Sequence, residues 1–332
     1  MRRRGIRIVS IIASAALVSG VTAGSANADP PTTVQSGAWQ ALADQVYANG
    51  SAAYSRQVAA GNNVPAFHVA ALAWYAGQRF GWQDSRTQTW LQRVYDRVTA
   101  SGGYGLGYAY DAYGDGTTNP ANTTYTITTA WHVGRLLIAG YDGGGIPASR
   151  VLAAVTAILD TPSADTSQCV SYSKYPNDTG KPCVWNVSAA AAWFLWRADQ
   201  RGIVPAGRDA EILTKLRTWR DYVRAHYSTA LGGWTYQDNT TALDDPGHLA
   251  ATVSAMYELD PTIGVTALPA YFSHYATAVS AVDVLIYDCS KVDADYGGVN
   301  SYARAVSGLS DADIVAKSAY APVALRVQTS CD

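Results

Sequence analysis

Four helix starts recur at nearly equal spacing along the chain, and this spacing limits the fold more than any other feature. They lie near Pro65, Tyr125, Asn186 and Pro246, about 60 residues apart. The helices that begin there share small residues, in the stretches AALAW, TTAWH, SAAAAW and LAATVSA. Small side chains let helices pack closely, and an internal period of this length is typical of repeated helical hairpins. We therefore expect an all-α fold.

Apolar residues at helical spacing predict the individual helices. Pro65 and Gly81 bound one of them, in the usual order of proline at the start and glycine at the end. Short β-like runs occur, but none alternates long enough to predict a sheet. Five or six hairpins, closed into a ring or stacked as a solenoid, would fill a single domain over residues 29–332. The predicted helices are Trp39–Ala60, Pro65–Gly81, Thr87–Ala100, Thr126–Ala139, Ser149–Leu159, Asn186–Arg201, Asp209–Tyr227, one from Pro246, Pro269–Val284 and Asp311–Val327.

The N-terminus has the pattern of a secretory signal peptide. Four arginines, at positions 2, 3, 4 and 7, precede an apolar run over residues 8–21, and Ala26-Asn27-Ala28 fits a cleavage site. The alternative is a membrane anchor, but the apolar run is too short to span a bilayer. We expect residues 1–28 to be removed and the mature chain to be secreted into the extracellular space.

Charge excludes some classes of partner. Loss of the four arginines in residues 1–28 moves the formal net charge from −2 to −6. A mildly acidic domain without a basic run predicts no nucleic-acid partner and no anionic membrane surface. The chain contains 22 tyrosines and 10 tryptophans but only 4 phenylalanines. Aromatic residues with a polar group suit half-wet surfaces such as sugar-binding clefts, and also ordinary helix contacts near solvent.

Four cysteines in an exported protein predict two disulfides. Of the three pairings we favour Cys169–Cys183, which would close a loop, and Cys289–Cys331, which would tie down the C-terminus. A zinc site is the alternative, but no CxxC or HxxH spacing supports it.

The helix-pair repeat resembles the alpha/alpha-toroid proteins. The resemblance also rests on the loop motifs Gly102-Gly103-Tyr104, Gly232-Gly233-Trp234-Thr235-Tyr236 and Gly297-Gly298, and it covers most of the mature chain. Toroids of this size in exported bacterial proteins are often glycoside hydrolases or polysaccharide lyases. The resemblance implies a toroid of about five to six hairpins, with a cleft at the end where the inner helices begin.

Loops before the inner helices would line such a cleft and carry the residues that bind substrate. We expect a polysaccharide or oligosaccharide substrate, bound by a monomer. The candidate substrate-binding residues are Tyr104, Tyr108, Tyr110, Tyr113, Arg135, Trp185, Asn186, Trp234, Tyr236 and Asp238, with Tyr172, Asp295 and Tyr296 on the same loops.

Paired carboxylates carry the first hypothesis for the reaction. Glycosidic hydrolysis needs two carboxyl groups that flank the bond, and Asp111 or Asp115 opposite Asp244 or Asp245 would supply them. Adjacent aspartates also push their pKa values apart, because like charges disfavour double ionisation. The structural alternative is that Asp245 caps the helix that has Pro246 in its first turn.

Histidines carry the second hypothesis, which is a lyase reaction. His132 or His248 would act as the general base, with Tyr108 or Tyr236 as the acid, and Arg135 or Asn186 near the uronate carboxylate. Each histidine could equally be a packed helix residue. A third hypothesis, from another class, is a glycan-binding or cell-envelope protein without catalysis, in which the aspartates are caps and turn residues.

The sequence predicts no cofactor. The loop Asp111–Asn119, DAYGDGTTN, is the one candidate for calcium, but its spacing departs from that of an EF-hand loop.

Overall fold

The computed structural model describes residues 47–267 except 49, 53, 245 and 265. These residues are helix-rich and contain no β-strand, only isolated β-bridges, so the all-α prediction is confirmed for this part of the chain. Helical residues at 47–48, 50–52 and 54–59 come first. The elements that follow are α2 (Ala66–Phe80), α3 (Ser85–Tyr95), η1 (Thr128–Val133), α4 (Gly134–Asp142), α5 (Ala148–Leu159), η2 (Pro176–Asp178), α6 (Trp185–Asp199), α7 (Asp209–Ala225) and α8 (Pro246–Leu259).

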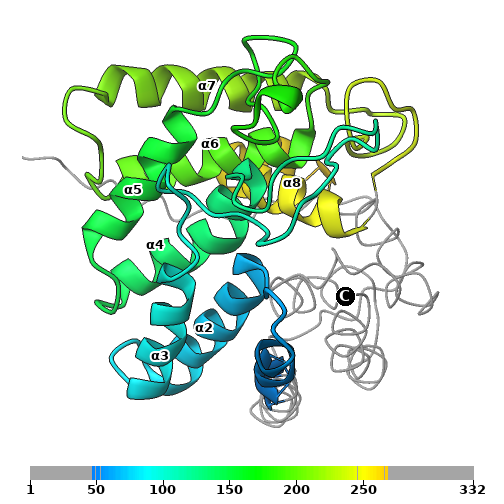
Figure 1. The fold of residues 1–332 in the computed structure, drawn as a ribbon. Coiled ribbons are helices and arrows are strands. Elements are labelled where there is room, and N and C mark those ends of the chain that lie inside the picture. Colours follow the sequence, from blue (N-terminus) through cyan, green and yellow to red (C-terminus); the bar gives the residue numbers. More distant parts are fainter. Residues whose placement is uncertain (1–46, 49, 53, 245, 265, 268–332) are drawn as a thin grey trace, which may run out of the picture.

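The described helices form two rows, which can be followed in Figure 1. In the inner row α2 contacts η1 and α4, these contact α6, and α6 contacts α8. In the outer row α3 packs on α2, α5 on α4, and α7 on α6. The chain therefore alternates between inner and outer helices, as the repeat in the sequence predicts.

Helix α6 is the centre of this arrangement because its middle, residues 189–195, is apolar on every side. Alanine fills positions 189–192, and Trp193, Phe194 and Leu195 follow, all buried. A helix that is apolar all round has to be covered on all sides. It contacts inner and outer helices alike, among them η1, α5, α7 and α8.

The outer helices α3 and α7 are amphipathic, with one apolar stripe each. Helix α7 buries Ile212, Leu216, Trp219 and Val223, which recur every three or four residues. Helix α3 begins two residues earlier than the pattern predicts, because Asp84 caps it and accepts the backbone N–H of Arg86 at 2.9 Å.

Helix α3 also ends at Tyr95, before the predicted end at Ala100. The chain turns back on itself there, with a bridge between Val98 and Tyr104. Gly102 has φ +82°, which favours glycine, and allows this reversal. The predicted helices Pro269–Val284 and Asp311–Val327 lie outside the described residues.

The predicted helix Thr126–Ala139 consists of two elements, the π-helix η1 and the α-helix α4. Threonine side chains tie its start to neighbouring segments. The Thr126 hydroxyl donates to the Ser171 carbonyl at 2.7 Å, and the Thr129 hydroxyl accepts the Tyr104 N–H at 2.9 Å. A single π turn of this kind is frequent at functional sites.

Three loops that precede inner helices are joined to one another. Tyr125, before η1, forms a bridge with Ser173, before α6. Val184, before α6, forms a bridge with Gln237, before α8. These backbone contacts place the loops side by side, at the N-terminal ends of the inner helices.

Candidate functional site

A pocket lies where the inner helices begin, and it encloses about 750 Å³ of empty space, part of it open to solvent. This is the end at which the toroid resemblance implies a cleft. The helices supply Phe67 from α2, Thr128, Trp131 and His132 from η1, Asn186 from α6, and His248 and Ala251 from α8. The segments before these helices supply Leu106, Tyr108, Tyr110, Tyr125, Ile127 and Tyr172.

Two imidazoles line the pocket, from different helices. The His132 ring lies 5.4 Å from the Phe67 ring, and the His248 ring lies 4.9 Å from the Tyr236 ring, centroid to centroid. Both side chains are half-buried, so each has one side against aromatic rings and some exposure. An imidazole that lines a pocket can form a hydrogen bond with a ligand, or act as a general base near neutral pH.

Tyrosines form a connected cluster on the loop side of the pocket. Ring centroids lie 6.4 Å apart for Tyr108 and Tyr110, 6.1 Å for Tyr110 and Tyr125, and 5.9 Å for Tyr125 and Tyr172, all edge-on. Burial raises the pKa of Tyr125 and of Tyr172 above the usual value. Their phenols therefore remain protonated and can donate hydrogen bonds.

Asn186 supplies an amide from the first turn of α6. Its side chain is 2% exposed, yet it lines the pocket. Its Oδ1 atom has no hydrogen-bond partner among the described residues. Because an unsatisfied buried polar atom costs stability, the amide is a candidate for a contact with a ligand.

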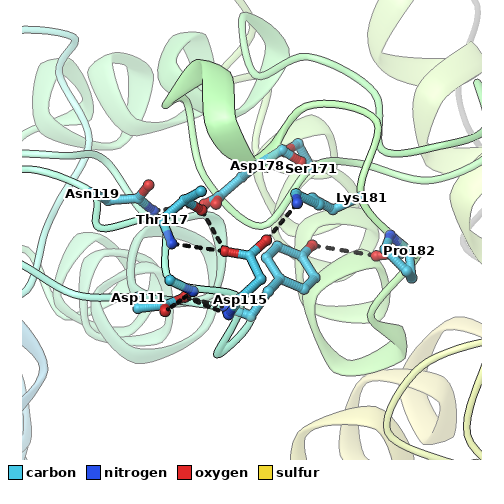
Figure 2. Close-up of polar contacts among 10 residues, drawn as sticks. Asp111, Asp115, Thr117, Asn119, Ser171, Asp178, Lys181 and Pro182 are labelled. Carbon is cyan, nitrogen blue, oxygen red and sulfur yellow. Dashed lines mark hydrogen bonds and ion pairs between the residues drawn. The ribbon is translucent and has the colours of Figure 1, made fainter.

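Asp111 and Asp115, two of the expected catalytic carboxylates, lie in a turn and do not line the pocket. Asp111 accepts the backbone N–H groups of Tyr113, Asp115 and Gly116 at 3.3, 3.2 and 2.7 Å. Figure 2 shows Asp115 between Thr117 and Lys181. The bonds from Lys181 and Thr117 hold the pKa of Asp115 well below its usual range.

This arrangement matches the expectation that the aspartates are turn residues. It also weakens the hypothesis that this loop binds calcium, because the two carboxylates are already bonded to protein donors. Within the described part of the chain, no group of three or more histidine, cysteine or acidic side chains is arranged to hold a metal.

Three of the aromatic residues expected to bind substrate lie in the core instead. Tyr104, Trp185 and Trp234 are 1%, 1% and 0% exposed, and none lines the pocket. The Trp234 indole donates to the Val223 carbonyl at 2.7 Å, which fixes it against α7. Because these side chains are buried, they have almost no surface for direct contact with a substrate. Large aromatic side chains near glycine turns also serve as core anchors.

Three other expected binding residues, Arg135, Tyr113 and Asp238, are not part of the pocket lining. Arg135 lies over the rings of Trp74 and Trp131, 4.8 and 4.9 Å from their centroids. The Tyr113 hydroxyl donates to the Pro182 carbonyl at 3.2 Å. Asp238 is exposed, but partial loss of hydration at its carboxyl group, together with the charge of Asp165, raises its pKa.

Asp244 is 4% exposed and is absent from the pocket lining. Its backbone N–H donates to the Trp234 carbonyl at 2.9 Å, which holds this loop against the core. Asp245, Asp295 and Tyr296 lie outside the described residues. The expected pairing of Asp244 and Asp245 with Asp111 or Asp115 thus has no counterpart in the described pocket.

The predicted disulfide Cys169–Cys183 is confirmed, with the two Cα atoms 6.1 Å apart. It closes the loop that carries the pocket residue Tyr172. Cys289 and Cys331 lie outside the described residues. None of the described helices is both long and apolar enough to cross a membrane.

Comparisons of the chain with protein-family models, curated proteins and solved structures found no match.

Sequence reasoning did not select Phe67, Thr128, Trp131 or Tyr125, which all line the pocket. All four lie within the first turns of inner helices or directly before one, as His132 and Asn186 do. Position relative to the repeated helix starts was therefore a better guide than residue type.

Proposed function

We propose that this protein is a secreted, monomeric alpha/alpha-toroid enzyme that cleaves a uronate-containing polysaccharide by β-elimination in this pocket. The observation that carries the proposal is the chemistry of the lining. Two imidazoles, four phenols and one amide surround the pocket, and no described carboxylate lines it. The disulfide Cys169–Cys183 supports an oxidising, extracellular location.

The reaction needs a base, an acid and a group that binds the uronate carboxylate. The base removes the proton at C5, the C5–H electron pair becomes the C4–C5 double bond, and the C4–O bond breaks. The leaving oxygen takes a proton from the acid. An imidazole is a suitable base because its pKa is close to neutral pH.

The side chains of the pocket fit these three roles. His132, from η1, and His248, from α8, are the candidate bases, and α6 contacts both of these helices. Tyr110 and Tyr172 are the candidate acids, since a neutral phenol can give its proton to a departing alkoxide. Asn186 is the candidate for binding the uronate carboxylate, to which its amide N–H groups can donate, while its unpartnered oxygen can accept from a sugar hydroxyl.

Hydrolysis by paired aspartates, the first hypothesis from the sequence, is the competing proposal. It requires two carboxyl groups at the scissile bond. Asp111 and Asp115 are held in their turn and Asp244 is buried outside the lining, so the described geometry favours elimination.

A panel of polysaccharides, incubated with the mature protein, separates the two reactions. The assay reads new reducing ends together with the ultraviolet absorbance of an unsaturated uronate. We expect both signals to rise on a uronate polymer. Reducing ends without absorbance would support hydrolysis, and Asp244→Asn would then be the variant to abolish it.

Three histidine variants test the mechanism. We expect His132→Asn or His248→Asn to abolish turnover while oligosaccharide binding persists, which would identify the base. His226→Asn is the matched control, because His226 stacks on Trp185 at 4.5 Å and is outside the pocket. Binding without any cleavage by the unmodified protein would instead support a non-catalytic glycan-binding protein.

A further inference from the structure

A buried carboxylate lies behind the tyrosines of the pocket. Asp178, in the short helix η2, is 1% exposed and forms no ion pair among the described residues. Its Oδ2 atom accepts the Asn119 amide at 2.7 Å and the Ser173 hydroxyl at 2.5 Å. Figure 2 shows Asn119 and Asp178 on the two loops that meet here. Its own carbonyl accepts the Ser171 hydroxyl at 3.0 Å, so the residue is anchored at both ends.

Asn119 and Ser173, the two side chains that donate to Asp178, are linked through the backbone to tyrosines of the pocket. Asn119 exchanges two backbone hydrogen bonds with Tyr110, at 3.0 and 2.8 Å. Ser173 follows Tyr172 in sequence and forms a bridge with Tyr125. The Asn119 amide also opposes, in part, the rise that burial causes in the pKa of Tyr125. One carboxylate therefore joins the backbone segments of three tyrosines that line the pocket.

Joining two loops through a buried carboxylate costs free energy of hydration. Hydrogen bonds from neutral donors to a carboxylate are shorter and stronger than neutral ones, but the charge loses its hydration. Packed apolar side chains often stabilise a protein as well or better. The directional bonds of Asp178 are therefore better explained by the need to fix positions than by a need for stability alone.

We propose that Asp178 is a positioning residue for the pocket, holding Tyr110, Tyr125 and Tyr172 in place through Asn119 and Ser173. Its part in catalysis rests on the proposed function, but its structural action does not. Asp178 touches no substrate, and it acts only through the loops that carry the tyrosines.

Exchange of the two bonded residues provides the test. Asp178→Asn replaces the charged acceptor by a weaker neutral one, and Asn119→Asp places two carboxylates against each other. The double variant N119D/D178N restores one amide and one carboxylate, with the donor and acceptor reversed. Lys181→Gln is the matched control, because it breaks only the exposed ion pair between the same loops.

Amide hydrogen exchange and oligosaccharide binding are the two measurements. We expect each single variant to speed exchange at Tyr110, Asn119 and Thr126 about tenfold or more. The first two amides each bond to the other residue's carbonyl beside the Asn119 side chain, and the Thr126 amide bonds to the Tyr172 carbonyl of the other loop. We expect binding to weaken by about the same factor. The double variant is expected to return both to within about threefold of the unmodified protein, and Lys181→Gln to change neither.

Two results would overturn the proposal. One is unchanged exchange at these three amides in Asp178→Asn. The other is faster exchange spread evenly through α5, α6 and α7, together with no rescue in the double variant, which would indicate a general loss of stability. If the unmodified protein binds and cleaves no uronate polymer, the proposed function fails, while the exchange measurements still decide the role of Asp178.

Discussion

Asn186 is the residue whose substitution we expect to weaken ligand binding without lowering the stability of the fold. Asn186→Leu keeps the approximate volume and removes an amide whose oxygen has no partner among the described residues. The free energy of unfolding should stay within about 0.5 kcal/mol or rise, because an unsatisfied polar atom is lost. Affinity for an oligosaccharide should fall about tenfold or more. Thermal unfolding and titration calorimetry measure the two effects on the same samples.

Asn119→Leu is the contrasting variant, at an equally buried asparagine. Its amide donates to Asp178 at 2.7 Å, so the substitution takes a donor from a buried carboxylate. We expect a loss of about 1.5–3 kcal/mol in unfolding free energy. An equal loss in Asn186→Leu would mean that Asn186 is a structural residue and would count against its proposed contact with substrate.

Residue type alone predicted the site poorly, whereas position in the repeat predicted it better. Asn186, His132, His248, Tyr108 and Tyr110 were selected from the sequence and line the pocket. The glycine-aromatic turns also drew attention to Tyr104 and Trp234, and the disulfide loop to Trp185, but all three are core residues. Composition could not separate the pocket residues from the core residues, since the same amphipathic aromatic side chains serve in the core and in sugar-binding sites.

At the scale of single elements, Gly134 sets the distance between α4 and α6. A Cβ atom there would lie 2.9 Å from both a Phe194 ring carbon and the Thr129 carbonyl oxygen. Helix propensity favours alanine over glycine by about 0.5–1 kcal/mol, whereas overpacking costs about 1–3 kcal/mol. We therefore expect Gly134→Ala to lower the free energy of unfolding, as measured by urea denaturation.

Phe194→Leu, alone and combined with Gly134→Ala, provides the control for that prediction. The smaller side chain removes the ring that the new methyl group meets, so the double variant should lose less than the sum of the two single changes. A gain in stability from Gly134→Ala by itself would show that the helices separate without cost.

Helices were predicted within a few residues, but their irregular parts were not. Apolar periodicity and the proline and glycine signals located α2, α5, α6 and α7. The π turn in η1 depends on bonds from Thr126 and Thr129 to distant segments, which no local pattern contains. The bridges between loops are likewise tertiary, and they decide which tyrosines face the pocket.

At the scale of the whole molecule, ion pairs predict a loss of stability in acid. The carboxyl pKa of Asp84 is lowered to about 2, and those of Asp115, Asp142 and Glu211 are also lowered, each beside an arginine or lysine. Groups with depressed pKa values stabilise the fold above their unfolded pKa and lose this contribution as the pH falls. Asp238, with a raised pKa, acts in the opposite direction.

The four lowered carboxyl groups outnumber Asp238, so we expect the melting temperature to fall between about pH 5 and about pH 2. Thermal scans across this range measure the effect. High salt should flatten the pH dependence, because the ion pairs are near the surface and are screened. A melting temperature that rises as the pH falls would contradict the assignment of these pairs as net stabilising.

The disulfide Cys169–Cys183 joins stability of the whole molecule to the shape of the pocket. It spans a sequence separation of 14 residues, for which the chain-entropy estimate is about 3 kcal/mol. The closed loop carries Tyr172, which lines the pocket, and Asp178. We expect C169S/C183S to lose about 2–4 kcal/mol in urea denaturation. Cys289 and Cys331 are retained in both proteins, so the difference reports this bond.

Binding by the same variant, measured where it is still folded, shows what the loop contributes beyond stability. If the disulfide holds Tyr172 and Asp178 in place, oligosaccharide affinity should fall at a temperature well below the melting transition, and amide exchange should rise in residues 169–183. If it stabilises mainly through the unfolded chain, the folded variant should bind as the unmodified protein does. The bonds that Ser171 and Ser173 donate to Asp178 lie inside the loop that the disulfide closes, so we expect the first result.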